Sequence, residues 1–242
     1  MFDLKGKKAL ITGSTQGIGF ATAQILSEAG AEVFINGGTS EAKVIDACKK
    51  VKGSKPAFCD LSQPGCAEKL YDITGDIDIL ISNASIQVRA PWEEITEEDF
   101  DKQLMVNFKS AFQLMQKYVP YMKDKKWGRI ITVGSVQQKT PHKDMAIYAS
   151  LKSAQVNLVK NLALQLAPYG ITVNNVAPGV IVTPRNDDAL SDSEYAKKVL
   201  SSIPSGYIGQ DRDCVYQILL LSSEEGRYIT GEDIFIDGGM SL

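Results

Sequence analysis

The chain has 242 residues, of which 44% are hydrophobic and 23% charged; these values are ordinary for a soluble globular protein, and the length favours one α/β domain. The net charge of −3 gives no basic surface for nucleic acid or anionic lipid. No apolar run reaches the roughly 18 residues that a membrane helix needs, and the run after the charged N-terminus is too short for a secretory signal. We therefore expect a cytoplasmic protein with no nucleic-acid or membrane partner.

Cysteine and histidine usage argues against a metal site. Cys48, Cys59, Cys66 and Cys214 have neither C-x-x-C spacing nor the density of a disulfide framework, so we interpret them as reduced and mostly buried thiols. His142 is the only histidine, whereas zinc and iron sites bring several ligands together. The sequence therefore predicts no bound metal.

Short apolar runs alternate with longer stretches of helical period along the whole chain. The predicted strands are Ala9–Thr12, Val33–Asn36, Pro56–Cys59, Ile77–Ser82, Arg129–Val133, Ile171–Ala177 and Ile234–Asp237. The predicted helices are Gly17–Ala29, Glu41–Val51, Gln63–Ile73, Glu97–Met122, Ala149–Ala167 and Arg212–Ser222. This alternation indicates a parallel sheet covered on both faces, and the lack of a linker favours one domain over residues 1–242. The irregular stretch at about 180–209 is a candidate substrate loop or lid.

A glycine-rich turn directly follows the first predicted strand. Gly13, Gly17 and Gly19 have the spacing G-x-x-x-G-x-G, and a predicted helix begins within the turn. Glycines let the backbone turn sharply and approach a pyrophosphate, and the helix N-terminus offers free N–H groups and the positive end of its dipole. The spacing alone also fits a plain strand–helix turn, but its place between the first strand and the first helix favours a dinucleotide.

Tyr148 and Lys152 lie four residues apart at the start of a predicted helix, so their side chains share one face. A free phenol is a poor base at neutral pH, and a nearby ammonium group favours its ionised form. The pair follows Ser135, which ends an apolar strand, and ligands of parallel sheets bind at the carboxyl ends of the strands. An exposed Tyr–Lys pair without a role is the alternative, but the placement favours a proton-transfer site.

In these motifs the chain resembles the short-chain dehydrogenase/reductase family over nearly its whole length. Besides the glycine turn, the resemblance rests, in order, on Asp60, Asn83-Ala84, Asn107, Ser135, Tyr148, Lys152, Pro178-Gly179, Thr183 and Gly231…Asp237-Gly238-Gly239. It implies a single, doubly wound Rossmann-type α/β domain, with a mostly parallel seven-stranded sheet and helices on both faces. It also implies an NAD(P)(H)-dependent oxidoreductase that moves a hydride between the nicotinamide and a secondary alcohol or carbonyl.

The resemblance implies a role for each catalytic residue. Tyr148 would exchange a proton with the substrate oxygen, and Ser135 would hydrogen-bond the same oxygen. Lys152 would favour the ionised form of Tyr148 and bind the nicotinamide ribose. Asn107 would kink its helix and hold a water that connects Lys152 to solvent, although a solvent-facing asparagine in mid-helix also fits the sequence.

A larger set of residues is expected to contact the cofactor. They are Gly13, Ser14, Gln16, Gly17, Ile18, Gly19, Asn36, Gly37, Gly38, Thr39, Asp60, Leu61, Asn83, Ala84, Tyr148, Lys152, Pro178, Gly179, Ile181 and Thr183. Within this set, Asp60 would accept a hydrogen bond from the adenine amino group, and Thr183 would lie at the nicotinamide carboxamide. The chain departs from the family at Ser85, where a glycine is usual, and thereby loses some backbone freedom.

The end of the second predicted strand bears on the choice between NAD and NADP. An acidic residue there binds the ribose hydroxyls of NAD and repels a 2′-phosphate, whereas Arg or Lys attracts the phosphate. Here Asn36, Gly37, Gly38 and Thr39 supply neither, and Gly38 stands where many NADP-dependent relatives have arginine. The expected cofactor is therefore NADP or NAD, with a slight preference for NADP.

Polar residues in the loops are the candidates for substrate contact. They include Gln87, Arg89, Gln137, Gln138, His142, Arg185 and Asn186. Such a set suits a sugar, a polyol or an oxo-acid, although loops are polar in general. A 3-oxoacyl thioester reductase is the alternative, but the basic residues are too few to form a landing surface for an acidic carrier protein. A non-catalytic dinucleotide sensor would lack Tyr148 or Lys152.

The two longest predicted helices favour self-association. Glu97–Met122 and Ala149–Ala167 carry more apolar positions, such as Phe112 and Leu162, than one sheet face can bury. In the family these helices pair across a two-fold axis. We therefore expect a homotetramer that takes a small-molecule substrate.

Overall fold

The computed structural model describes residues 2–184, 186 and 191–242. Seven parallel strands form one sheet in the order β3-β2-β1-β4-β5-β6-β7. They are β1 (Lys8–Ile11), β2 (Glu32–Gly37), β3 (Lys55–Phe58), β4 (Ile79–Ser82), β5 (Gly128–Val133), β6 (Ile171–Pro178) and β7 (Asp233–Ile236). The sheet confirms the predicted doubly wound Rossmann-type fold. Its strand order reverses between β1 and β4, and ligands of such sheets bind beyond the strand ends at this point.

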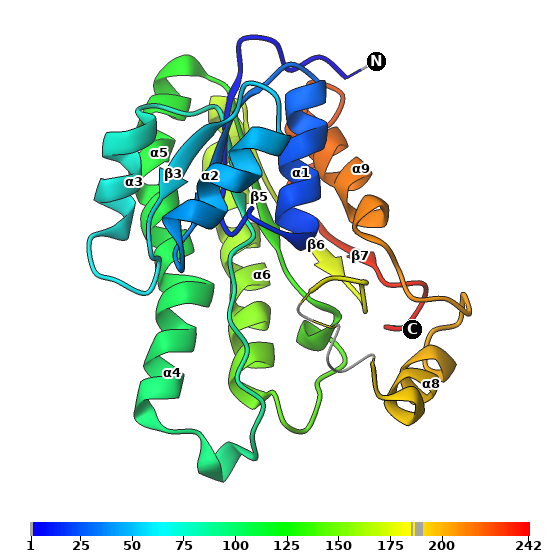
Figure 1. The fold of residues 1–242 in the computed structure, drawn as a ribbon. Coiled ribbons are helices and arrows are strands. Elements are labelled where there is room, and N and C mark those ends of the chain that lie inside the picture. Colours follow the sequence, from blue (N-terminus) through cyan, green and yellow to red (C-terminus); the bar gives the residue numbers. More distant parts are fainter. Residues whose placement is uncertain (1, 185, 187–190) are drawn as a thin grey trace.

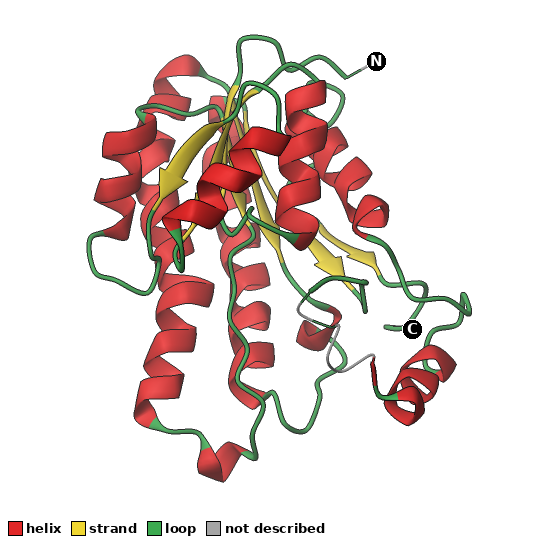
Figure 2. Cartoon of the chain, in the orientation of Figure 1, coloured by secondary structure: helices red, strands yellow, loops and turns green. Residues whose placement is uncertain are grey.

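Helices cover both faces of the sheet, as Figures 1 and 2 show. They are α1 (Gly17–Glu28), α2 (Glu41–Lys50), α3 (Cys66–Thr74), α4 (Glu97–Leu104), α5 (Ser110–Lys125), α6 (Ala146–Leu166), α8 (Ser193–Ser201) and α9 (Asp211–Ser222). The buried side chains of α1, α2 and α9 pack on one face, and those of α3, α5 and α6 pack on the other. The structure is therefore a three-layer α/β/α sandwich with two cores.

The two cores follow from the pleat of the strands. Successive residues of a strand point to opposite faces. In β1, Ala9 and Ile11 belong to the core beneath α1 and α9, whereas Leu10 belongs to the core beneath α5 and α6. All three are fully buried. A strand that is buried on both faces must be apolar at every position, which explains the unbroken apolar runs of the sequence.

Two helical regions differ from the prediction. The single helix expected at Glu97–Met122 is divided into α4 and α5 by a π-helical turn (η2, Met105–Lys109), which contains Asn107. The stretch expected to be an irregular loop contains α8, whose N-cap Asp192 accepts hydrogen bonds from the backbone of Glu194 and Tyr195. Hydrophobic period alone cannot detect one extra residue in a turn, since the apolar face continues on both sides of it.

The four cysteines are free thiols, as the sequence predicts. Cys59, Cys66 and Cys214 are buried, Cys48 is half-buried, and all four are unpaired. Burial raises the pKa of the Cys59 thiol to about 11 and that of Cys214 to about 12, so neither is a reactive thiolate at neutral pH. No described helix is long and apolar enough to cross a membrane. Likewise, no group of three His, Cys, Asp or Glu side chains among the described residues could hold a metal ion.

A buried arginine closes the end of the sheet opposite the strand carboxyl ends. Arg129, at the start of β5, is 1% exposed. Its guanidinium donates to the carbonyl oxygens of Gly128, Gly170 and Ser223, and its Nη2 lies 3.2 Å from Oε2 of Glu224. One side chain thus satisfies carbonyl groups from three separate segments, which links β5, the start of β6 and the end of α9.

Replacing Arg129 with methionine should lower the free energy of unfolding by about 3 kcal/mol, because buried carbonyl groups would lose their donors. Arg227→Met is the matched control. Arg227 also pairs with Glu224 but has a 70% exposed side chain, so its loss should cost less than about 0.5 kcal/mol. Urea denaturation of the two variants measures the difference, and equal costs would contradict the structural role given to Arg129.

Candidate active site

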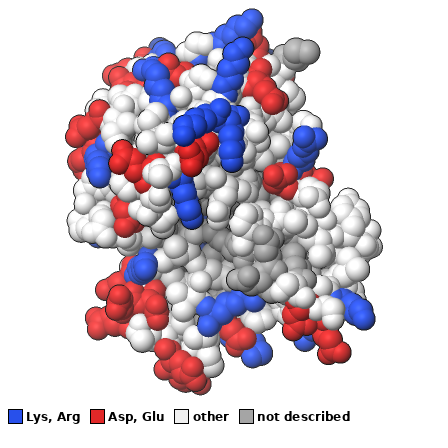
Figure 3. Space-filling view, viewed as in Figure 1, with Lys and Arg blue, Asp and Glu red and all other residues white. Residues whose placement is uncertain are grey.

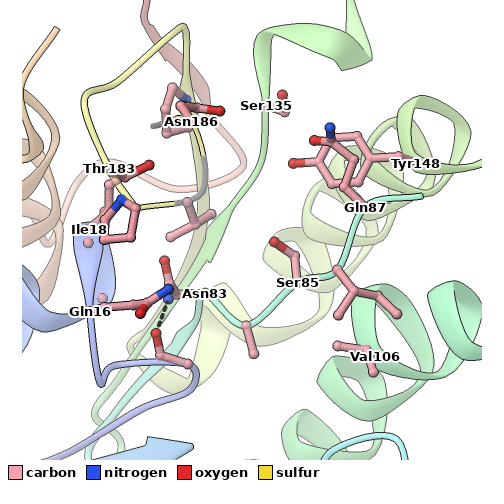
Figure 4. A pocket seen from close by; sticks show the side chains of 18 of the residues that line it. Gln16, Ile18, Asn83, Ser85, Gln87, Val106, Ser135, Tyr148, Thr183 and Asn186 are labelled. Atoms are coloured by element: carbon pink, nitrogen blue, oxygen red, sulfur yellow. Dashed lines mark hydrogen bonds between the residues drawn. The ribbon is translucent and has the colours of Figure 1, made fainter. Parts of the chain in front are cut away.

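A cleft of about 1260 Å³ lies at the carboxyl ends of the strands. The turn after β1 and the segments after β2, β4, β5 and β6 line it, and α8 contributes the side chains of Tyr195, Lys198 and Val199. In Figure 4, Gln16, Ile18 and Thr183 lie on one side of this pocket, and Gln87 and Tyr148 lie on the other. Small-molecule pockets usually span about 300–1,000 Å³, so this cleft is large enough for a dinucleotide with a small substrate.

The glycine turn approaches β4 so closely that side chains are excluded. Gly13 has a φ of 62°, and a Cβ atom there would lie 2.8 Å from Cα of Ala84. A Cβ atom on Gly19 would lie 2.5 Å from Nδ2 of Asn83. The first residues of α1 line the cleft, and this end of the helix has no side-chain cap and no acidic residue in its first turn. Their N–H groups and the positive helix end suit a pyrophosphate, so the residues present fit the expected dinucleotide.

Two of the residues expected to touch the cofactor hold the glycine turn in place. Asn36 is 1% exposed, and its side chain accepts from the N–H of Gly13 and donates to the carbonyl oxygens of Ala57 and Cys59. Ser14 is fully buried and does not line the cleft, because its hydroxyl donates to the carbonyl of Ile11. The expected contact of the Ser14 side chain therefore needs correction, since it holds the backbone that faces the cleft. Asn36 also lines the cleft, so its contact with the cofactor stays a prediction.

Asn83, which follows β4, is hydrogen-bonded in a similar way to the turn after β1. Its side-chain amide donates to the carbonyl oxygens of Thr12 and Gly13, at 2.9 and 3.0 Å. In return, the hydroxyl of Thr12 accepts from the backbone N–H groups of Asn83 and Ala84. Asn83 and Ala84 still line the cleft, so the end of β4 and the glycine turn form one rigid wall.

Tyr148, Lys152 and Ser135 come together beside the cleft. Tyr148 and Ser135 line it, whereas Lys152 is 1% exposed and lies beneath the tyrosine, with Nζ 5.7 Å from the centre of the phenol ring. Nζ of Lys152 donates to the carbonyl of Val133 at 2.6 Å and to Oε1 of Gln155 at 3.2 Å. A buried ammonium is thereby fixed next to the phenol.

Ser135 is the N-cap of a 3-10 turn, η3 (Val136–Gln138). Its hydroxyl oxygen accepts from the N–H of Gln137 at 3.2 Å. The hydroxyl proton has no acceptor among the described residues. It therefore remains available for an oxygen atom in the cleft.

Asn107 lies in the π-helical turn and is 2% exposed, so the solvent-facing alternative is wrong. Its side chain accepts from the N–H of Ile86 at 2.8 Å and donates to the carbonyl of Ile86 at 2.9 Å. This pairing holds the loop after β4 against the helix. Asn107 does not line the cleft, and its expected link to Lys152 through a water stays a prediction.

Comparison with known proteins agrees with this geometry. A family model described as enoyl-(acyl carrier protein) reductase matches residues 13–241. Glucose 1-dehydrogenase of Gluconobacter oxydans is 37% identical over 247 residues, which cover 98% of this chain and 92% of that protein. The structure of a 3-oxoacyl (acyl-carrier-protein) reductase from Agrobacterium tumefaciens C58 with NADP bound has a TM-score of 0.92 and 34% identity, over 98% of this chain and 95% of that one. A gluconate 5-dehydrogenase from Burkholderia cenocepacia J2315, in complex with NADP and tartrate, has a TM-score of 0.91 and 31% identity, over 99% and 97%.

The chain belongs to the short-chain dehydrogenase/reductase family. This confirms the predicted family and its enzyme class, a dehydrogenase or reductase that uses NADP or NAD and acts on a CH–OH group or the corresponding carbonyl.

The substrate end of this short-chain dehydrogenase contains some of the expected residues. Gln87, Gln137 and His142 line the cleft, and Nδ1 of His142 accepts from the N–H of Asp144. Arg185 lies outside the described residues. Gln138 does not line the cleft, because its side chain pairs with Asp233 and with the backbone of Ser135.

Sequence reasoning missed a cation at the cofactor end. Lys43 is exposed in the first turn of α2 and lines the cleft together with Gly38 and Thr39. The helical position gives the signal: three residues after the N-cap Ser40, Lys43 lies in the turn that faces the end of β2. At Gly38, by contrast, a Cβ atom would lie 2.8 Å from Cα of Asp60, so an arginine would push the two strand ends apart.

Proposed function

We propose that this enzyme is a cytoplasmic, NADP-preferring oxidoreductase that interconverts a secondary alcohol and a carbonyl in a polar small molecule, such as a sugar, a polyol or an oxo-acid. The observation that carries the proposal is the placement of Ser135 and Tyr148 in the cleft above the buried ammonium of Lys152. The unpaired thiols fit a reducing compartment. The absorbance of the nicotinamide during incubation with sugars, polyols, oxo-acids and 3-oxoacyl thioesters tests the substrate class.

The mechanism that we propose divides proton and charge handling among three side chains. A bound nicotinamide supplies or accepts the hydride. Tyr148 exchanges the proton with the substrate oxygen, and the ammonium of Lys152 stabilises the phenolate that this exchange leaves or requires. Ser135 donates its hydroxyl proton to the same oxygen and stabilises the negative charge that develops there.

Gln137 favours a hydroxylated substrate. It lines the cleft, and its side-chain Oε1 is buried without a hydrogen-bond partner among the described residues. A buried carbonyl oxygen without a donor costs free energy, which a substrate hydroxyl would recover. Gln87 and His142 add further polar groups to the same end of the cleft. A steroid-like substrate would leave these groups unpaired.

The surface beside the cleft disfavours the thioester alternative. The first turn of α4 carries Glu97, Glu98 and Asp99, and the turn before it carries Glu93 and Glu94. Acidic side chains accordingly gather at the lower left of the molecule in Figure 3, whereas its lower centre and right carry both charges. An acidic carrier protein would be repelled there. Activity on free thioesters without stimulation by a carrier protein would agree with this view.

Tyr148→Phe should reduce kcat at least about a hundredfold while the cofactor dissociation constant stays near that of the wild type, because only the proton-transfer group is removed. Steady-state kinetics and fluorescence titration with NADPH measure the two quantities. Tyr216→Phe, an exposed tyrosine on α9, is the control and should behave as wild type. Retention of more than a few per cent of kcat by folded Tyr148→Phe would refute the mechanism, and a wild type that binds NADPH without turning over any substrate would favour the sensor.

The preference for NADP rests on Lys43. Its side chain lies at the end of the cleft where Gly38 and Thr39 follow β2, and we expect the adenine-side ribose to bind there. A 2′-phosphate there would gain a charge-assisted contact with the ammonium group. Solvent screens an exposed lysine, so we expect a moderate preference rather than an absolute one.

Lys43→Gln should therefore raise KM for NADP about fivefold and leave KM for NAD nearly unchanged, in line with the energy of an exposed ion pair. Lys50→Gln, at the far end of α2, is the matched control. Initial rates with both cofactors at low and high salt provide the measurement. Equal changes for the two cofactors would show that Lys43 does not contact the 2′-phosphate.

We also propose that the enzyme is a homotetramer. A groove between α5 and α6 is lined mainly by apolar side chains, among them Phe112, Met115 and Leu162. Phe112 is 38% exposed, and Leu164 on α6 is 82% exposed. An exposed apolar surface along two neighbouring helices is typical of an interface between subunits.

Sedimentation velocity at micromolar concentration should give a mass four times that of the chain. Phe112→Glu should dissociate the assembly at least partly, because it places a charge in an apolar interface. Tyr228→Glu, a fully exposed position outside these helices, should leave the mass unchanged. A stable monomer of the wild type would contradict the proposal.

A further inference from the structure

A hydrogen-bonded network of polar side chains lies beneath Ser135, outside the cleft. The side-chain Oε1 of Gln138 accepts from the backbone N–H of Ser135 at 3.3 Å. Its Nε2 donates to both carboxylate oxygens of Asp233, at 2.7 and 2.8 Å. Asp233 lies at the start of β7, 95 residues further along the chain. Neither Gln138 nor Asp233 is among the described residues that line the cleft.

Asn175 of β6 completes this network. Its amide donates to Oδ1 of Asp233 at 2.7 Å and approaches Oε1 of Gln138 at 3.5 Å, while its own oxygen accepts from the hydroxyl of Thr132 at 2.6 Å. Asn175 and Thr132 are fully buried. The carboxylate of Asp233 forms no ion pair with any described residue, so amide N–H groups provide its stabilisation.

The amides of Asn175 and Gln138 fit against the backbone before Ser135 because Gly134 has no side chain. A Cβ atom on Gly134 would lie 2.5 Å from Nδ2 of Asn175 and 2.6 Å from Oε1 of Gln138. The carbonyl of Gln138 also accepts from the hydroxyl of Ser153, which directly follows Lys152 in α6. The same glutamine therefore contacts the turn of Ser135 through its side chain and the helix of Tyr148 through its backbone.

We propose that Gln138, Asn175 and Asp233 are positioning residues that fix the hydroxyl of Ser135 relative to Tyr148. The hydrogen-bond donors and acceptors of this network can be matched in only one arrangement. A carboxylate can only accept, so Asp233 forces the NH₂ end of Gln138 toward itself and leaves Oε1 for the N–H of Ser135. That bond starts the turn in which the N–H of Gln137 occupies one lone pair of the Ser135 hydroxyl, so the hydroxyl proton is directed into the cleft. The inference rests on the proposed role of Ser135.

Exchanging acid and amide tests the inference. In Asp233→Asn, an N–H group faces an N–H group whichever way the introduced amide turns, and in Gln138→Glu two carboxylates face each other. Each single variant should lose at least about tenfold in kcat, with KM and the NADPH dissociation constant within about twofold of wild type. In the double variant Asp233→Asn/Gln138→Glu, the introduced amide can donate to the introduced carboxylate while its oxygen accepts from Asn175, so a donor again faces an acceptor between the two positions without a change in net charge. This double variant should recover to within about threefold of wild type.

Two further measurements separate positioning from general damage. Amide hydrogen exchange of the segment 134–139 should accelerate in each single variant and return to the wild-type rate in the double variant, whichever substrate is used. In a Ser135→Ala background, which itself should cost about 10²–10³ in kcat, Asp233→Asn should cause no further loss. Asp72→Asn, an exposed acid on α3, is the control for the loss of a charge.

The outcomes are distinguishable. If Ser135→Ala retains wild-type kcat, the proposed role of Ser135 fails. If Ser135→Ala is impaired while folded Asp233→Asn has normal turnover and normal exchange, the positioning inference alone fails. A folded double variant that is no better than the two single variants would overturn it as well.

Discussion

The close approach of the glycine turn to the end of β4 is the constraint on which the cofactor end depends. Gly13 and Ala84 are so close that even a methyl group is excluded between them. This contact survives because Asn36, Asn83 and Thr12 hydrogen-bond the turn to its neighbouring strands. The polar side chains are directed into the protein, and the backbone N–H groups of the α1 N-terminus are left for a phosphate.

At the catalytic end of the cleft, buried hydrogen bonds likewise hold a functional group in place, and that group is the ammonium of Lys152. Lys152 is buried, and its ammonium donates to the carbonyl of Val133 and to the side-chain oxygen of Gln155. Both of these acceptors are neutral oxygens, so they hold the ammonium beside the phenol without adding a formal negative charge of their own. Tyr148 can therefore experience a fixed charge whose position does not depend on solvent.

The sequence allows the prediction of whatever is local or periodic. The glycine spacing, the apolar strands and the four-residue interval between Tyr148 and Lys152 are each properties of a short segment, and the family and the parallel sheet follow from them. The direction in which a side chain points depends on partners that are distant in the sequence. Asn36 has the position of a cofactor ligand in the sequence, but carbonyl groups of β3 and the loop after it take its donors, and that pairing exists only after the strands have aligned.

The residues beneath Ser135 show the same limit most clearly. Asp233 and Gln138 are 95 residues apart, and nothing in their neighbouring sequence distinguishes them from exposed polar residues. They meet because β7 pairs with β6, and β6 pairs with β5, which brings the start of the last strand beneath the turn that follows β5. A parallel sheet gathers the ends of its strands at one edge, so residues from the last strand can fix the geometry of a catalytic group that follows an earlier one. The sheet order therefore determines which distant side chains can support the site, and only the structure reveals which of them do.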